Sequence, residues 1–266
     1  MVISLIVVGL MGLFFGIFLT IIYLKFKVEE NPLYNQIYSL LPKANCGGCG
    51  FAGCSGFAES LIEGKVTPDK CVLIEVNSLE EICNILGILK KEKVRKIAKV
   101  CCYGGINAKK KFEYKGIKTC FALSTIFDSN FECIYGCVGY GDCIKVCPVK
   151  AIEMGENEIP IISSEKCIGC GKCVEICPKK IIKLIPKEKE IYIACSSYDR
   201  GALVIKICQS GCIGCGRCVK ICPKNAIIIE NNLAIIDYEK CDFCKKCVEE
   251  CPRKIIFTSE LSLLHA

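Results

Sequence analysis

Residues 167–178 read CIGCGKCVEICP, and similar runs follow at residues 212–223, CIGCGRCVKICP, and 241–252, CDFCKKCVEECP. Each run has the spacing C-x2-C-x2-C-x3-C-P, in which a short loop places three thiolates around one cubic iron-sulfur cluster. A fourth run, CIYGCVGYGDCIKVCP at residues 133–148, ends in the same way but is more widely spaced. The sequence therefore predicts a protein that carries electrons.

The four runs form two pairs, and the ligands are expected to cross over within each pair. The first three cysteines of one run hold a cluster together with the Cys-Pro cysteine of the other run. The expected ligand sets are Cys133, Cys137, Cys143 and Cys177; Cys167, Cys170, Cys173 and Cys147; Cys212, Cys215, Cys218 and Cys251; and Cys241, Cys244, Cys247 and Cys222. The wider loop of the first run either alters the potential of its cluster or has no electronic consequence.

The composition argues against other uses of cysteine. The 266 residues include 26 cysteines but no tryptophan and a single histidine, His265 near the C-terminus. Zinc sites usually recruit histidine as well as cysteine, which disfavours a zinc-finger protein. Secreted disulfide scaffolds are smaller and do not carry four Cys-Pro runs. Catalytic residues that make or break bonds are not apparent in the sequence.

A different cysteine motif precedes the four runs. The segment CGGCGFAGC at residues 46–54 supplies Cys46, Cys49 and Cys54, and Cys71 follows after a short amphipathic segment that Gly64 is expected to end. The glycines allow the backbone to fold tightly around a cluster and to direct its N–H groups at the sulfurs. We expect these four cysteines to bind a further [4Fe-4S] cluster, with a zinc knuckle as the alternative.

The first residues of the chain predict a membrane anchor. Residues 2–24 contain no charged side chain, and a helix of that length spans about 34 Å, enough to cross a bilayer core of about 30 Å. A signal peptide would have a basic start and a shorter apolar stretch. Lys25 and Lys27 follow directly. The positive-inside rule therefore predicts a single-pass protein of the prokaryotic cell (inner) membrane, with the rest of the chain on the cytoplasmic side.

The cysteines outside these motifs allow two interpretations. Residues 77–100 are expected to form a helical linker that opens with a capping box, Ser78 and Glu81, and that buries Cys83. Residues 101–132 form an intermediate segment. An extra cluster at Cys102, Cys120, Cys195 and Cys208 is one expectation, and the alternative is that these are buried or redox-inert thiols.

The predicted fold class is α+β. One N-terminal transmembrane helix (residues 1–26) is followed by a small four-cysteine iron-sulfur domain (27–76) and, after the linker and intermediate segment, by two tandem ferredoxin-like two-cluster modules (133–190 and 191–266). Two-stranded hairpins are expected around residues 156–157 and 231–232, and short helices after each Cys-Pro. With so little chain per cluster, the metal sites are expected to hold much of the fold together.

The basic composition does not predict binding to nucleic acid. The formal net charge of +7 counts every thiol as neutral. An oxidised [4Fe-4S] cluster with its four thiolates contributes about −2, so five clusters bring the loaded chain to about −3.

The order of these motifs resembles a known family. A single apolar N-terminal helix, the connector KFKVEENP (residues 25–32), the motif LPKANCGGCGFAGC (41–54) and then ferredoxin repeats resemble the iron-sulfur electron-transfer subunit (the B-subunit) of the Rnf complex, the ion-translocating ferredoxin:NAD oxidoreductase. The resemblance covers nearly the whole chain. It implies a membrane-anchored relay with five or six [4Fe-4S] clusters. This relay would accept electrons from soluble reduced ferredoxin and pass them to other subunits, coupled to Na⁺ or H⁺ transport.

Two alternatives belong to other classes of protein. The chain would be a polyferredoxin subunit of another membrane redox complex, of the hydrogenase or formate-oxidising type, or a zinc-stabilised membrane adaptor. The early CGGCGFAGC motif beside an apolar helix argues against the first alternative. The second alternative, a zinc-stabilised adaptor, requires the purified protein to be colourless.

Overall fold

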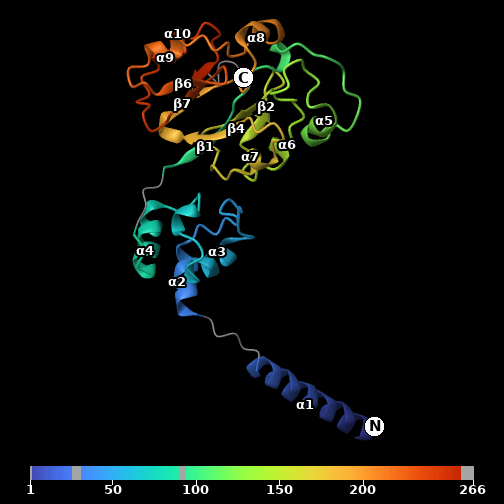
Figure 1. Ribbon diagram of the computed structural model, residues 1–266. Coiled ribbons are helices and arrows are strands. Elements are labelled where there is room, and N and C mark those ends of the chain that lie inside the picture. Colours follow the sequence, from blue (N-terminus) through green and yellow to red (C-terminus); the bar gives the residue numbers. More distant parts are fainter. Residues whose placement is uncertain (1, 26–30, 90–93, 259–266) are drawn as a thin grey trace.

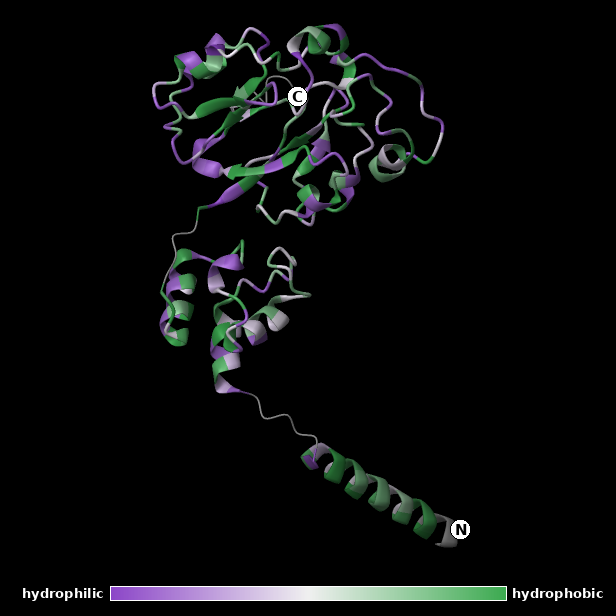
Figure 2. Ribbon diagram, in the orientation of Figure 1, coloured by the Kyte–Doolittle hydropathy of each residue, from purple (hydrophilic) through white to green (hydrophobic). Residues whose placement is uncertain are grey.

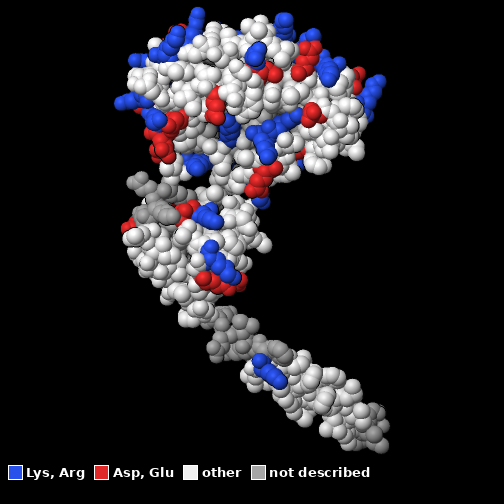
Figure 3. Space-filling view, in the orientation of Figure 1, with Lys and Arg blue, Asp and Glu red and all other residues white. Residues whose placement is uncertain are grey.

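The computed structural model describes residues 2–25, 31–89 and 94–258 (Figure 1). Its first element, α1 (Val2–Lys25), is the one helix among these residues that is long and apolar enough to cross a membrane. The side chains of residues 6–25 are exposed. The helix is apolar along most of its length (Figure 2), and charge is seen only near its connector end (Figure 3). The expected apolar helix is therefore present.

Three helices form a small unit around the early cysteine motif. They are α2 (Pro32–Leu40), α3 (Cys54–Ile62) and α4 (Val76–Leu86), with a 3-10 turn, η1 (Pro68–Lys70), between the last two. Ile37, Phe57 and Ile82 are fully buried in its core. Cys83 is buried in the same core, as predicted, and Gly64 follows the end of α3 in the left-handed conformation.

The expected linker helix is shorter than predicted and starts differently. Glu75, rather than Ser78, is the N-cap residue of α4, and no side-chain hydrogen bond caps the helix. The helix ends at Leu86 because Gly87 adopts a left-handed C-cap conformation, which glycine reaches without a steric penalty. Residues 96–100 of the predicted linker form a strand, β1 (Lys96–Val100). The expectation of a continuous helix over residues 77–100 is therefore wrong.

The described part of the cysteine-rich body contains antiparallel two-stranded sheets arranged in the same way twice. In the first module β1 pairs with β4 (Ile182–Pro186), and β2 (Ile152–Met154) forms a hairpin with β3 (Pro160–Ile162). In the second module β5 (Ile191–Ile193) pairs with β8 (Ile256–Thr258), and β6 (Ile227–Glu230) forms a hairpin with β7 (Leu233–Ile236). Both predicted hairpins are confirmed, and β1 adds a strand from outside residues 133–190 to the first module.

Short helices lie before each Cys-Pro rather than after it. They are α6 (Asp142–Lys145), α7 (Lys172–Ile176), α9 (Arg217–Ile221) and α10 (Lys246–Glu250), and each contains the third cysteine of its run. The ring of a proline disfavours helical backbone in the residue before it. Cys177, Cys222 and Cys251 accordingly have extended backbone, which ends the helix there. The predicted order of helix and Cys-Pro was wrong for this reason.

The intermediate segment packs on both modules. It contains η2 (Gly105–Asn107) and α5 (Cys120–Phe127), and isolated bridges pair Ala108 with Cys208 and Lys110 with Phe131. Two further elements, η3 (Lys187–Lys189) and α8 (Gly201–Ile207), lie before and after β5. The N–H of Ile106 also donates a 3.2 Å hydrogen bond to the carbonyl oxygen of Asn157 in the first module, so residues 101–132 contact both modules.

A buried ion pair lies at the end of the first module, where it meets the second. Lys99 of β1 is 3 % exposed, and its Nζ lies 2.5 Å from Oε1 of Glu190, which is 7 % exposed and directly precedes β5. The hydroxyl of Ser164 accepts a hydrogen bond of 2.8 Å from Lys99 and donates one to Glu190. The ammonium group also lies 5.7 Å from the centre of the Tyr192 ring. Both charges are thus removed from water and compensated locally.

Replacement of Lys99 by Met is expected to lower the free energy of unfolding by about 3–5 kcal/mol, because Glu190 then keeps a buried charge without its cation. Anaerobic urea denaturation of the cluster-loaded protein measures this change. Lys166→Met is the matched control, since Lys166 and Glu153 form an exposed pair at 3.9 Å and should contribute about 0–1 kcal/mol. Equal effects of the two substitutions would contradict the structural role of the buried pair.

Candidate iron-sulfur sites

One half of the second module brings together cysteines from both of its runs. Cys212, Cys215, Cys218 and Cys251 line one cavity, so three cysteines of one run meet the Cys-Pro cysteine of the other. In the other half, burial raises the pKa of Cys247 to about 12, and the neighbouring Cys218, Cys241 and Cys244 thiolates add to this shift. The sulfur of Cys222 accepts a hydrogen bond of 3.3 Å from the backbone N–H of Ala226.

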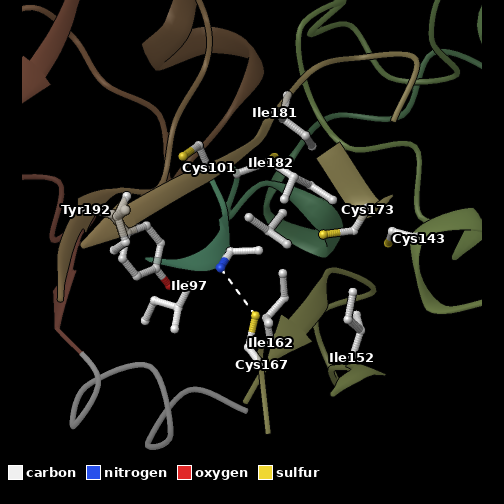
Figure 4. Packing of buried hydrophobic residues seen from close by; sticks show 14 of the residues in the cluster. Ile97, Cys101, Cys143, Ile152, Ile162, Cys167, Cys173, Ile181, Ile182 and Tyr192 are labelled. Carbon is white, nitrogen blue, oxygen red and sulfur yellow. Dashed lines mark hydrogen bonds between the residues drawn. The ribbon is translucent and has the colours of Figure 1, made fainter. Parts of the chain in front are cut away.

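One half of the first module repeats this arrangement. Cys147, Cys167, Cys170 and Cys173 line a single cavity beneath β1 and the β2–β3 hairpin. The N–H of Ala98 in β1 donates a 3.4 Å hydrogen bond to the sulfur of Cys167 (Figure 4), and the N–H of Ala151 donates one of 3.2 Å to Cys147. Hydrogen bonds of this kind to cluster sulfurs are among the features that tune cluster potential.

Backbone geometry explains the glycine between the first and second cysteines of a run. Gly169 has φ +69°, and a Cβ there would lie 2.3 Å from the carbonyl oxygen of Lys96 in β1. Glycine at this position therefore lets the cysteine loop lie directly against the strand. In the last run Phe243 has a similar φ of +62°, but no such approach requires a glycine there.

The early motif lies on a tight turn between α2 and α3. Cys46 and Cys49 are half-buried on this turn, while Cys54 opens α3 and Cys71 follows η1, both buried. Cys49, Cys54 and Cys71 belong to the same core. The side-chain oxygen of Asn45 accepts a 2.8 Å hydrogen bond from the N–H of Cys54, which fixes the turn to the start of the helix. The role of Asn45 was not foreseen from the sequence.

The first run departs from the expected ligand set. Cys137, Cys143 and Cys177 lie near one another, but the thiol beside them is Cys120: burial raises the pKa of Cys143 to about 12, with Cys120 and Cys177 as the next causes. Cys120 opens α5, and the N–H of Phe121 donates a 3.2 Å hydrogen bond to the carboxylate of Asp142 at the start of α6. This contact holds Cys120 beside Cys143.

Cys133 instead lies in another cavity, between the two modules. The cysteines in its lining are Cys102, Cys133, Cys137, Cys195 and Cys208. Three of these were expected to form the extra site, but Cys120 is not among the residues lining this cavity. The signal in the sequence was the irregular spacing of the first run, C-x3-C-x5-C, and Cys143 does not line the cavity that Cys133 enters.

The cysteines that the structure describes are not arranged as a site for a single metal ion. Thiolates around one zinc ion at about 2.3 Å lie within about 4 Å of one another. Among the residues that the structure describes, no group of three Cys, His, Asp or Glu side chains meets the requirement for a single ion. Cysteine sets that line common cavities without this close approach fit a larger cluster, in which inorganic sulfide separates the irons.

Burial sets the electrostatics of these sites. Loss of hydration raises the pKa of Cys102 and Cys173 to about 12 and that of Cys195 to about 11. Without iron these thiols therefore remain protonated at neutral pH. Ligation requires the thiolate, so cluster insertion must release protons and place compensating positive charge in the core.

Family models match the cysteine-rich parts of the chain. A model described as a putative Fe-S cluster matches residues 41–73. Models described as 4Fe-4S dicluster domains match residues 132–181 and 166–226 and, separately, residues 211–256. The match over residues 166–226 extends from the first module into the second.

Relatives match most of the chain. The B-subunit of the proton-translocating ferredoxin:NAD(+) oxidoreductase complex of Clostridium ljungdahlii is 43% identical over 239 residues, which are 89% of this chain and 84% of the relative. The Na(+)-translocating counterpart of Acetobacterium woodii is 39% identical over 88% of this chain and 71% of the relative. The B-subunit of the ion-translocating oxidoreductase complex of Methanosarcina acetivorans is 36% identical over 90% of both chains. The chain therefore belongs to the B-subunit family of ion-translocating ferredoxin:NAD(+) oxidoreductase complexes.

Proposed function

We propose that this chain is the membrane-anchored [4Fe-4S] electron relay of such a complex, accepting electrons from reduced ferredoxin and passing them to partner subunits. The observation that carries the proposal is the repeated gathering of four cysteines from two runs, at Cys147 with Cys167, Cys170 and Cys173, and at Cys251 with Cys212, Cys215 and Cys218. The cysteines of the last run with Cys222, those around Cys143 and those of the early motif complete the relay. Bound clusters supply one-electron chemistry, and the protein sets their spacing and potential.

The residues of the chain support a relay rather than a bond-making site. Thiols are buried in the modules, and backbone N–H groups of residues 98, 151 and 226 donate to their sulfurs. These donors stabilise thiolate charge and so adjust potential. The cavities that gather four cysteines are lined mostly by apolar side chains, which limits access of water. The chain thus orients and insulates the clusters.

The membrane arrangement follows from α1. The helix anchors the chain, and Lys25 at its end favours a cytoplasmic position for the modules, where reduced ferredoxin is available.

Residues 2–24 contain no ionisable side chain except Tyr23, and ion pathways in membranes need polar or charged groups. The ion path therefore belongs to partner subunits. The relatives are named for different ions, protons and Na⁺, so the coupling ion is a property of the assembled complex.

Anaerobic mixing with ferredoxin tests the proposal. The full-length cluster-loaded chain in detergent is mixed with stoichiometric reduced ferredoxin, and the cluster signals of both proteins are followed by EPR. Reoxidation of ferredoxin with the appearance of reduced-cluster signals from this chain is the expected result. Ferredoxin that remains reduced, although dithionite reduces the same clusters, would overturn the proposed electron donor.

The turn of the early motif lies against the first module. A Cβ on Gly48 would lie 2.9 Å from the Cβ of Cys170 and 3.0 Å from Cγ2 of Val72. Such a close approach brings the expected N-terminal cluster next to the cluster that Cys170 would hold. Electrons would therefore pass between the α2–α4 unit and the first module at this contact.

Gly48→Ala is expected to separate the two clusters, because the added methyl group has no room between Val72 and Cys170. Pulsed EPR on the reduced protein should show a weaker dipolar coupling between the two clusters, with an unchanged iron content. Gly56→Ala is the control: a Cβ at this position of α3 meets nothing within 4 Å, and alanine favours the helix by about 1 kcal/mol. Unchanged coupling in Gly48→Ala would contradict electron transfer across this contact.

A further inference from the structure

Five cysteines from four segments line the cavity between the modules. One of them, Cys137, neighbours Cys102 and also Cys120 and Cys143 of the adjacent site, and the other four surround the cavity itself. Cys102 follows β1, Cys133 opens the first run, Cys195 follows β5 and Cys208 follows α8. Each of the four is 8–9 % exposed. Three of them belong to no Cys-Pro run, and the fourth belongs to the run with irregular spacing.

Two glycines show how closely these sulfurs surround one space. A Cβ at Gly104 would lie 3.5 Å from Sγ of Cys102 and 3.9 Å from Sγ of Cys208. A Cβ at Gly136 would lie 3.7 Å from the sulfurs of both Cys102 and Cys133. The absence of a side chain at both positions leaves room for a group that bridges these sulfurs.

The cavity also provides donors to its sulfurs. The N–H groups of Gly104 and Cys137 each donate a 3.4 Å hydrogen bond to Cys102, and the N–H of Ser197 donates one of 3.5 Å to Cys195. Sulfurs of Cys147, Cys167 and Cys222 in the ferredoxin runs accept the same kind of bond. In this respect the cavity is built like the other cluster sites.

An arginine lies beside the fourth cysteine. The half-buried Arg253 donates hydrogen bonds of 2.7 Å to the carbonyl oxygen of Cys208 and 3.3 Å to that of Gly211. A cluster with four thiolates carries net negative charge, so a guanidinium next to its loop offsets part of that charge.

The first module does not lose a ligand when Cys133 points into this cavity. Thr119 caps α5 by accepting a 3.1 Å hydrogen bond from the N–H of Ala122, and the contact between Phe121 and Asp142 ties the helix start to α6. Cys120, the first residue of α5, is thereby held next to Cys143 and Cys177. Cys120 thus supplies a thiol beside Cys137 and Cys143 in this part of the first module.

We propose that Cys102, Cys133, Cys195 and Cys208 hold a sixth [4Fe-4S] cluster between the modules, and that Cys120 replaces Cys133 in the set with Cys137, Cys143 and Cys177. This assignment rests on the proposed relay function and deepens it. The N–H of Cys137, a ligand of one cluster, donates to the sulfur of Cys102, a ligand of the other. The sixth cluster is therefore a bridge for electrons between the two modules.

Pairs of substitutions distinguish this grouping from the one implied by motif spacing. Iron and acid-labile sulfide are measured on the anaerobically reconstituted full-length chain, which should hold about 24 iron atoms. Cys133→Ala and Cys195→Ala should each remove about four, and the double variant also about four, because both cysteines serve one cluster. Cys120→Ala with Cys195→Ala should remove about eight. A loss of about eight irons from the variant with Cys133→Ala and Cys195→Ala, and of about four from the variant with Cys120→Ala and Cys195→Ala, would overturn the assignment. So would an unchanged iron content in Cys195→Ala.

Cys101→Ala is the matched control. Cys101 is buried next to Cys102 but does not line the cavity, so its iron content should equal that of the wild type. Failure of the relay function itself would appear differently, as zinc without sulfide or as clusters that ferredoxin cannot reduce.

A second measurement uses the native chain and does not depend on the folding of variants. Clusters are released stepwise by limited oxidation, the freed thiols are alkylated, and the peptides are analysed by mass spectrometry. Cys133 should become alkylated together with Cys195 and Cys208, and Cys120 together with Cys143 and Cys177. Co-release of Cys133 with Cys143 would overturn the assignment.

Discussion

Removal of iron from the purified protein is expected to unfold both ferredoxin-like modules. The strands contain only three to five residues, and the short helices that carry the third cysteines contain four or five. Cysteines make up a large part of the cores of both modules, with Cys143, Cys167 and Cys173 in one and Cys212, Cys218 and Cys247 in the other. The clusters would occupy the space between these thiols, so their removal takes away the centre of each core.

The expected effect is the loss of the whole cooperative transition, because domains of this size are stable by only about 5–15 kcal/mol and metal binding can contribute as much. Circular dichroism and urea denaturation before and after anaerobic chelation measure the change. The helical signal of α1 should persist in detergent, which serves as an internal control. Reconstitution with iron and sulfide should restore the transition. An iron-free protein with an unchanged unfolding midpoint would contradict this account of stability.

Deletion of residues 1–25 is expected to move the protein from the membrane fraction to the soluble fraction with its clusters intact. The side chains of residues 6–25 are exposed, and a Cβ on Gly9, Gly12 or Gly16 would meet no atom within 4 Å. The helix therefore adds nothing to the packing of the modules. Its burial in lipid is favourable because each apolar residue contributes about 0.3–0.6 kcal/mol at the helix centre.

Membrane fractionation and iron analysis test the deletion together. A variant in which the order of residues 2–24 is shuffled keeps the apolar composition and should remain in the membrane. If the deletion variant still sediments with membranes, another surface anchors the chain. If it is soluble but has lost iron, α1 supports the fold in a way that its exposed side chains do not indicate.

Several local patterns in the sequence predicted local structure, although the capping box at Ser78 and the helices after each Cys-Pro were wrong. The apolar run predicted α1, Gly64 the end of α3, and the Ile-rich segments both hairpins. Left-handed conformations at Asn231 and Asn232 form the turn of the second hairpin, and asparagine is one of the residues that tolerate them. These features depend on neighbouring residues, which is why periodicity and turn chemistry were sufficient.

Features that depend on distant residues were not predictable in the same way. β1 is a strand because it pairs with β4, more than eighty residues later, as from Lys99 to Lys183. The spacing of the cysteines does not show which other thiols Cys120 and Cys133 lie beside. Cys120 lies near Cys143 because the contact between Phe121 and Asp142 joins α5 to α6. The irregular first run indicated that something differed there, but only the packing of the intermediate segment relates Cys133 to Cys102, Cys195 and Cys208.

Anaerobic iron and acid-labile sulfide analysis of the full-length protein, with an EPR spectrum after dithionite reduction, tests the central claim most directly. The account predicts about 24 iron atoms and as many sulfides per chain, with the broadened signals of reduced clusters that interact magnetically. Zinc without sulfide, in a colourless and EPR-silent protein, would contradict it.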